Sequence, residues 1–214
     1  MFFMGIFLRG KFMNYKITFK MQSPIVVYEP IMFDSLLMYA YIKEKLGYVP
    51  QLLEIGDESN IELPDYLLKK HESGVYLASV MQSDDEPLLD LSNFTKHFHK
   101  RNIDLIENKK LKILTSKGQY KSYNLPFETK NYDSVYFVID TVNIDEVMRL
   151  LNKQIASLGK KRNRGYGLIE NISYEQSDLK ILRPAPDIDG DLYLPVKPPY
   201  WRINDLIQQR MIEI

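Results

Sequence analysis

The chain has 214 residues, in which 28 Lys and Arg are balanced by 28 Asp and Glu, and it contains no cysteine. Because 45% of the residues are apolar, the chain can bury enough surface to fold, which argues against disorder and fits one large or two small domains. Without cysteine, disulfides, thiolate zinc sites, iron–sulfur clusters and a cysteine nucleophile are excluded. A net charge of zero argues against a nucleic-acid partner, unless the charge is unevenly distributed.

Charge is strongly segregated along the chain. Residues 93–130 and 149–167 each carry a net charge of +6, whereas residues 54–92 carry −8 and residues 131–148 carry −4. If the two basic segments meet in the fold, they form a surface that attracts a polyanion. If they pair with the acidic segments, no such surface exists, and charge alone leaves both alternatives open.

Sequence periodicity predicts strands interleaved with two helices. Met13 opens the first strand pattern, so residues 1–12 are expected to be a disordered extension or an alternative start. Alternating or β-rich runs predict strands at residues 15–21, 25–28, 74–82, 134–142 and 167–174. Apolar residues at helical spacing predict helices at residues 31–46 and 144–158, each followed by a terminating glycine.

The remaining segments are expected to be insertions, loops and an irregular tail. Residues 54–92 form an acidic insertion that ends in a loop over 83–91, and a basic segment, 93–130, follows it with a hairpin around Lys117-Gly118. Prolines predict irregular backbone at residues 183–186 and 198–201, and a short helix is expected at 204–211.

This order of elements predicts an α+β fold. Strand, helix, strands, strand, helix and strand suit a ferredoxin-like, RNA-recognition-motif-like antiparallel sheet with helices on one face. We expect a single domain over residues 13–214. The strand–helix units at 15–47 and 134–158 correspond loosely, but this pattern is too weak to establish an internal repeat.

The sharpest motif is the glycine-rich basic loop at residues 159–167, Gly-Lys-Lys-Arg-Asn-Arg-Gly-Tyr-Gly. The glycines Gly159, Gly165 and Gly167 allow tight turns and close approach of the backbone to a ligand. The side chains expected to contact RNA are Lys160, Lys161, Arg162, Asn163, Arg164 and Tyr166. The loop lies between a helix and a strand, the wrong order for a dinucleotide fingerprint, and it lacks the ending of a P-loop. The alternative is a solvated turn that happens to be basic.

A second basic motif alternates cations with an aromatic residue at residues 96–101. Its expected RNA contacts are Lys96, His99, Lys100 and Arg101. His97 and His99 are candidates for general acid–base catalysis of RNA cleavage, but exposed histidines on a basic helix or loop are the favoured interpretation. His-x-His has no further ligands nearby, so no metal site is expected.

Two motifs in the tail favour structural roles. Trp201, beside Tyr200, is expected to pack in the core rather than to stack on a ligand. The run Asp187-Ile188-Asp189-Gly190-Asp191 lacks the spacing of a calcium loop and is expected to be a polar turn. No cofactor is expected.

These motifs together resemble proteins of the RAMP superfamily of CRISPR systems. The similarity rests on the segments 19–24, 30–40 and 158–167, with further support from Arg183-Pro184 and residues 198–201. More narrowly, the chain is similar to the handle-binding, five-type subunit of type IV effector complexes, over about residues 14–202.

The resemblance implies a role in a cytoplasmic ribonucleoprotein complex for antiviral defence. It implies a ferredoxin-like fold with a degenerate second copy or an inserted subdomain. It also implies a non-catalytic subunit that grips the 5′ handle of the guide RNA and caps a filament of backbone subunits. The implied partners are the guide RNA and the backbone and large subunits, with no membrane. By position in the motif, Lys160, Lys161, Arg162, Arg164 and Tyr166 would line the RNA.

Two alternatives of other classes stay open. The first is a metal-independent endoribonuclease that processes repeat RNA with His97 or His99. The second is a plain interaction module without RNA. The acidic segment 54–92 is not part of the motif that carries the resemblance, and one option for it is an inserted loop that faces a partner subunit.

Overall fold

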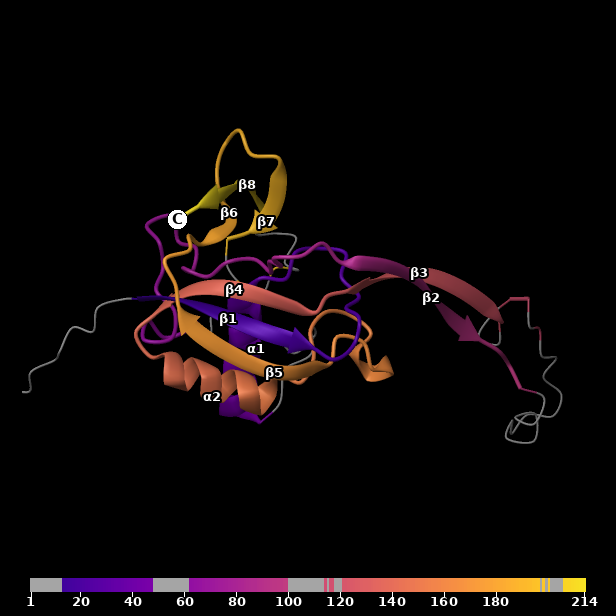
Figure 1. Cartoon of the computed structure of the whole chain (residues 1–214). Coiled ribbons are helices and arrows are strands. Elements are labelled where there is room, and N and C mark those ends of the chain that lie inside the picture. The colour runs from indigo at the N-terminus through magenta and orange to yellow at the C-terminus, as the bar shows by residue number, and fades with distance from the viewer. Residues whose placement is uncertain are drawn as a thin grey trace, which may run out of the picture.

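The computed structural model describes residues 13–47, 62–99, 114, 116–117, 121–196, 198, 200 and 206–214 (Figure 1). The expectations for residues 1–12, for Lys100 and Arg101, for Trp201 and for most of the hairpin at 111–123 lie outside these residues.

The body of the molecule is built on an antiparallel sheet of three strands. These strands are β1 (Met13–Met21), β4 (Ser134–Thr141) and β5 (Ile169–Gln176), and β1 lies in the centre of the order β4-β1-β5. Alternate residues such as Ile17, Phe19 and Phe137 are fully buried, which explains the period of two in the sequence. The strands predicted here are confirmed.

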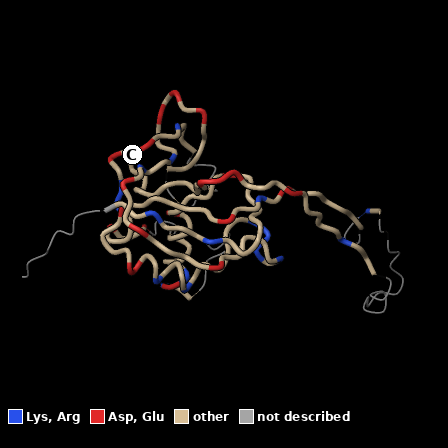
Figure 2. Tube along the Cα trace, in the orientation of Figure 1, with Lys and Arg blue, Asp and Glu red and all other residues tan. Residues whose placement is uncertain are grey.

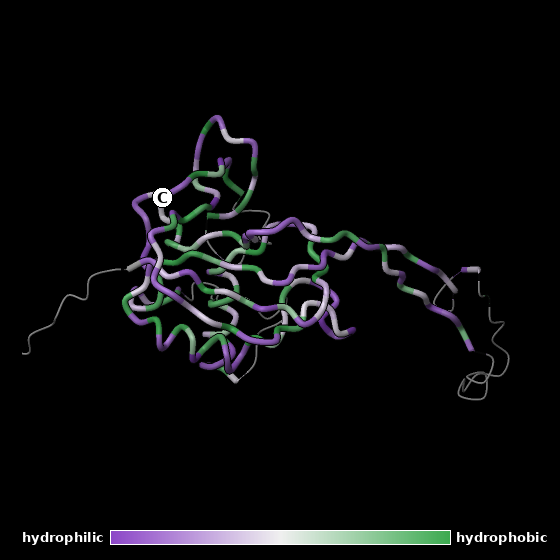
Figure 3. The backbone as a smooth tube through the Cα atoms, in the orientation of Figure 1, coloured by the Kyte–Doolittle hydropathy of each residue, from purple (hydrophilic) through white to green (hydrophobic). Residues whose placement is uncertain are grey.

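Both helices cover the same face of this sheet. α1 (Phe33–Leu46) and α2 (Ile144–Gln154) place their apolar residues in one core with β1 and β4 (Figures 1 and 3). Gly47 ends α1 in the left-handed conformation, as predicted. α2 ends four residues earlier than expected, because Ile155 turns to an extended conformation. Ile155 and Leu158 remain buried in the core without helical backbone.

Two segments predicted as strands do not form continuous strands. Ala78 and Gln82 each form an isolated antiparallel bridge with the outer edge of β4, while Val80 donates to Leu182 instead. Residues 25–28 likewise form isolated bridges, from Ile25 and Val26 to two different neighbours. In both cases the backbone divides its hydrogen bonds between neighbours, so no single ladder extends along the segment.

A two-stranded arm projects from the body (Figure 1). It consists of β2 (Leu88–Lys96) and β3 (Tyr123–Asn131), paired in antiparallel register over their full lengths. The acidic loop expected at 83–91 is therefore too long, since β2 begins at Leu88. We call β2 and β3 together the arm.

The tail forms a separate sheet, where irregular backbone at 183–186 and a helix at 204–211 were predicted, while Pro198 and Tyr200 lie outside its strands as expected. β6 (Leu182–Pro186), β7 (Leu192–Pro195) and β8 (Leu206–Glu213) have the order β6-β8-β7. The expectation of irregular backbone at 183–186 is wrong because β6 is an edge strand, where proline is tolerated. The expected helix at 204–211 is wrong from Leu206 on, because β8 pairs on both sides.

A buried ionic network joins the tail sheet to the body. Asp34, at the start of α1, and Arg183, on β6, are each about 1% exposed, and their charged groups are 3.5 Å apart. Tyr200 donates to the Asp34 carboxylate over 2.5 Å, and Arg183 donates to the backbone carbonyls of Tyr76 and Ala78. Burial raises the pKa of the Asp34 carboxyl, and the nearby Arg183 guanidinium opposes that rise.

We expect Arg183→Met to lower the free energy of unfolding by about 3–5 kcal/mol, because it leaves the Asp34 carboxylate buried without its partner. The matched control is Lys180→Met, since Lys180 forms an exposed pair with Glu213 and its loss should change stability little. Urea unfolding followed by circular dichroism measures both. Equal stability of the two variants would contradict a structural role for the network.

Candidate nucleic-acid interface

The glycine-rich loop is a compact turn with an unusual backbone. Gly159, Lys161, Gly165 and Gly167 all have positive φ angles, and residues Arg162–Arg164 form a short 3₁₀ helix between them. Lys161 is the one positive-φ residue other than glycine in the described chain. The loop places Lys160 and Arg162 over rings of the body, and Lys161 and Arg164 over rings of the arm.

Gly159 and Gly167 are required by close backbone contacts. A Cβ at Gly167 would lie 1.9 Å from the carbonyl oxygen of Leu158, and one at Gly159 would lie 2.6 Å from that of Val26. Neither contact tolerates a side chain. The structural role predicted for these two glycines therefore has a direct steric reason.

Residues 23–26 hold the loop in place by hydrogen bonds. The amide of Gly167 donates to Pro24, and the amide of Lys160 donates to Val26, both over 2.8 Å. The Ser23 hydroxyl donates to the carbonyl of Gly165 and accepts from the amide of Leu168. Residues at both ends of the loop are thus tied to one short segment of the body.

The same segment also holds the base of the arm. Ile25 and Lys130 exchange two backbone hydrogen bonds, of 2.8 and 2.9 Å, next to the bonds that hold the loop. We call residues 23–26 the hub. Because the hub bonds the loop through Val26 and the arm through Ile25, it fixes the loop beside the base of the arm.

Each cation of the loop lies over an aromatic ring. Arg164 is 3.8 Å from the centre of the Phe94 ring on the arm, and Lys161 is 4.5 Å from that of Phe127. The other two contacts, at 5.0 and 5.7 Å, are Lys160 over Tyr28 and Arg162 over Tyr39. An aromatic ring positions a cation without neutralising its charge.

Among the described residues, these four cations form no ion pair with a carboxylate. Lys160, Arg162 and Arg164 are exposed, and so is Asn163 at the tip of the loop. By contrast, Lys16 on β1 pairs with Asp84 at 3.0 Å. The alternative in which acidic segments neutralise the basic ones therefore does not apply to the loop.

Tyr166 faces the arm. Its ring meets Phe127 edge to face, with centroids 5.5 Å apart, and its side chain is half-buried. This ring contact packs the loop against the arm. It gives Tyr166 a packing role, and base stacking by Tyr166 stays a prediction.

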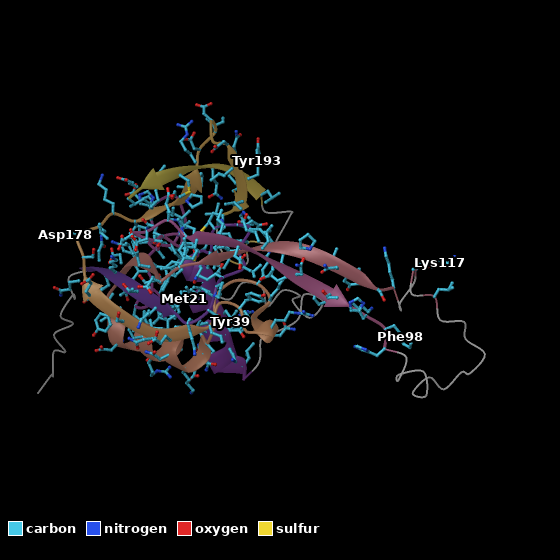
Figure 4. All side chains as sticks on the ribbon, turned by 45° about the vertical axis from the view of Figure 1, so that its right-hand side comes forward. Met21, Tyr39, Phe98, Lys117, Asp178 and Tyr193 are labelled. Carbon is cyan, nitrogen blue, oxygen red and sulfur yellow. The ribbon has the colours of Figure 1, made fainter. Side chains whose placement is uncertain are left out.

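The second basic motif begins at the outer end of the arm. Lys96 ends β2 and lies 5.8 Å from the centre of the Tyr123 ring, while His97 and His99 are exposed just beyond it. Figure 4 labels Phe98 in this region, far from the body. The loop and Lys96 are thus linked along one face of the arm through Phe94, whose ring meets Tyr123 at 5.5 Å.

The face of the sheet opposite the helices is not a comparable basic surface. Lys16 there is paired and also covers the Tyr136 ring at 4.2 Å. Val138 is buried beneath Leu77 and Ile181. The loop and the arm face beside it are therefore the better candidate interface, and Figure 2 shows basic residues close together on the loop.

The other candidate motifs have local structural explanations. Asp187 accepts from the amide of Asp189 and pairs with Arg210, as expected of a polar turn. His71 contacts Ser73. Within the described ranges no group of three or more His, Asp or Glu side chains is placed to hold a metal ion. In the same ranges no helix is long and apolar enough to cross a membrane.

Comparison with known families places the chain in a type IV CRISPR system. The family model of the CRISPR type IV associated protein Csf3 matches residues 14–211. The chain therefore belongs to the Csf3 family, which confirms the type IV CRISPR association recognised from the sequence. A search of curated protein sequences returns no significant match.

Among solved structures, the chain is similar to one chain of a cryo-EM structure titled as Type III-B Cmr-beta bound to cognate target RNA. The two chains are 13% identical, with a TM-score of 0.40, and the match covers 78% of this chain. The chain spans 61% of the length of that relative.

We expect Phe94→Leu to weaken binding of a labelled single-stranded RNA roughly fivefold, since an exposed cation–π contact contributes on the order of 1 kcal/mol. Phe94→Trp should bind as tightly as the wild type, because Trp is the strongest partner for a cation. Fluorescence anisotropy gives both affinities.

The control is Tyr174→Leu, an exposed aromatic on β5 away from the loop, which should leave the affinity unchanged. If Phe94→Leu and Phe94→Trp weaken binding equally, packing rather than the ring's charge distribution holds the cations.

Proposed function

We propose that the chain is a non-catalytic, RNA-binding subunit of a CRISPR effector complex, which holds the 5′ handle of the guide RNA and caps the backbone filament. The observation that carries this proposal is the set of four loop cations, three of them exposed, without a carboxylate partner in the described chain. Family membership supports the type of system, and the geometry of the loop supports the polyanion.

The chemistry of the loop favours contact with phosphates over reading of bases. The nearest aromatic rings, Tyr28, Phe94 and Phe127, already lie under lysine or arginine side chains. These cations pair with no carboxylate in the described chain, and the rings beside them are already covered. Such a site suits the phosphate backbone of an RNA of any sequence. Selectivity for the handle would then come from other parts of the complex or from RNA shape.

The arrangement of the body supports a ferredoxin-like fold. β1 lies between β4 and β5, both antiparallel to it, with two helices on one face. The bridged segment at residues 78–82 lies along the outer edge of β4, where such a fold has its fourth strand. On this reading the arm and the tail sheet are additions to the common fold.

The two proposed roles, holding the 5′ handle of the guide RNA and capping the filament, rest on the resemblance to the five-type subunit. A subunit at the end of a filament needs one RNA-binding face and one protein-binding face. The zero net charge of the chain fits this division, because strong nonspecific attraction to bulk nucleic acid is avoided.

Replacing Lys160, Lys161, Arg162 and Arg164 together with alanine should weaken guide-RNA binding by at least tenfold. It should also reduce the slope of log affinity against log salt by up to about 3, if each cation contacts one phosphate of a single strand. The measurement is a salt titration of binding to a guide RNA.

The charge-matched control replaces four cations that already pair with carboxylates, Lys20, Lys153, Lys180 and Arg210. This control should keep both the affinity and the slope near wild-type values. Equal losses in both variants would reduce the effect to net charge, and unchanged binding in the loop variant would refute the proposal.

The exposed pair His97 and His99, next to Lys96, supports one alternative, a metal-independent endoribonuclease that processes repeat RNA. For the non-catalytic subunit we expect no specific product when purified protein is incubated with labelled repeat RNA in EDTA. A specific cut that disappears in His97→Ala or His99→Ala would establish the nuclease instead.

A further inference from the structure

The loop divides its cations between two surfaces. Two of them lie over rings of the arm, whereas Lys160 and Arg162 lie over rings of the body. The ring next to Arg162 is that of Tyr39 on α1 (Figure 4), and 5.7 Å separates the guanidinium from the ring centre. This contact joins the basic loop to a helix that lies outside the glycine-rich motif.

A further cation, on α1 itself, lies over the same ring. Lys43 follows Tyr39 by four residues, so the two side chains lie on one face of the helix, one turn apart. The Lys43 ammonium is 5.7 Å from the centre of the Tyr39 ring. Because Arg162 lies at the same distance from that centre, at most twice this distance separates the two charges. The half-buried ring thus holds a cation of the loop and a cation of the helix near each other.

No carboxylate among the residues that the structure describes forms an ion pair with Lys43. Glu44 follows it in the chain but contacts α2, where it pairs with Lys153 at 2.9 Å and with Arg149 at 3.2 Å. Hydrogen bonds from Lys153, Gln154 and Arg149 lower the pKa of the Glu44 carboxyl. Glu44 is therefore ionised and already balanced by α2, and it does not offset the charge of Lys43.

Two cations at one ring form a site for an anion. Lys43 and Arg162 repel each other, and an anion bound beside them relieves that repulsion. Tyr39 positions both cations without neutralising either. A lysine binds a phosphate as a point charge, and phosphate is the group that the adjoining loop is proposed to contact.

We propose that the RNA backbone continues from the loop onto α1, where Lys43 binds a further phosphate and Tyr39 positions Lys43 beside Arg162. This inference rests on the proposed RNA-binding role of the loop and extends it beyond the glycine-rich motif. The path runs on the side of the sheet that carries both helices. It avoids the opposite face, where Lys16 is paired with Asp84.

The alternative role of Lys43 is to stabilise the helix. A lysine in the last turn of a helix interacts favourably with the helix dipole, and α1 has two there, Lys43 and Lys45. Lys45 lies over Tyr41 instead, at 4.8 Å, and projects from α1 roughly 200° around the helix axis from Lys43. The two lysines separate the two roles, because both interact with the dipole and only Lys43 lies beside the loop.

The test compares Lys43→Ala with Lys45→Ala in the purified full chain, by a salt titration of binding to a labelled guide RNA. Lys43→Ala should reduce the slope of log affinity against log salt by about 0.7, the contribution of one phosphate of a single strand, and weaken binding roughly fivefold at about 0.1 M salt. Lys45→Ala should bind as the wild type does. Both variants should show the same small change in thermal unfolding. Equal affinity and slope in the two variants would overturn the proposal and leave Lys43 with the helix role.

Three further variants test the charge and the ring. Lys43→Arg keeps the cation and should keep the wild-type affinity and slope. Tyr39→Phe keeps the ring and should also bind as the wild type does, whereas Tyr39→Leu should weaken binding roughly threefold because both cations lose their ring. Equal losses in Tyr39→Phe and Tyr39→Leu would overturn the positioning role of Tyr39.

The loop variant with four alanines separates this proposal from the proposed function. If that variant loses RNA while Lys43→Ala binds as the wild type does, the proposed function stands and the path over α1 is wrong. If the loop variant binds RNA normally, the proposed function is refuted, and so is a path that starts from the loop.

Discussion

The candidate interface depends on the hub, a stretch of four residues that hydrogen-bonds to both of its neighbours. Val26 and Pro24 accept amides of the glycine-rich loop, and Ile25 pairs with Lys130 at the base of the arm. The hub lies just after β1, the central strand of the body. The positions of the loop and the arm are therefore fixed relative to that buried strand. Cations that would repel one another are thereby held close together, each over an aromatic ring that leaves its charge intact.

A second constraint acts on the tail. The buried pair of Asp34 and Arg183, completed by Tyr200, links the start of α1 to β6 through charges taken out of water. Such a pair stabilises a fold only while its geometry is complete. It favours one placement of the tail sheet over others, because any displacement of β6 would leave the Asp34 carboxylate buried without the Arg183 guanidinium. The tail therefore belongs to the body, although its strands form a sheet of their own.

The regular part of the fold could be predicted from the sequence because its patterns are local. The alternation in β1 and β4 and the glycine after α1 each report burial or backbone conformation within a few residues. The tail was predicted wrongly because its prolines occupy an edge strand and its last segment takes its conformation from strands paired on both sides. The cations of the loop were evident, but Tyr28, Tyr39 and Phe127 carry no signal near residue 160. Phe94 and Phe127 lie within the basic segment 93–130, but that segment was recognised by its charge, and only folding brings the rings to the loop.

The pairing of the arm restricts how its sequence can change in length. Since side chains alternate between faces, a single inserted residue within β2 or β3 would turn that strand's side chains to the opposite face beyond that point. The ring of Phe94 in β2, or that of Phe127 in β3, would then face away from the loop cations. Insertions in pairs, or in the residues that connect the two strands, preserve the parity. In relatives of this chain, the arm should therefore vary in length by even steps along its strands, while its connecting segment varies freely.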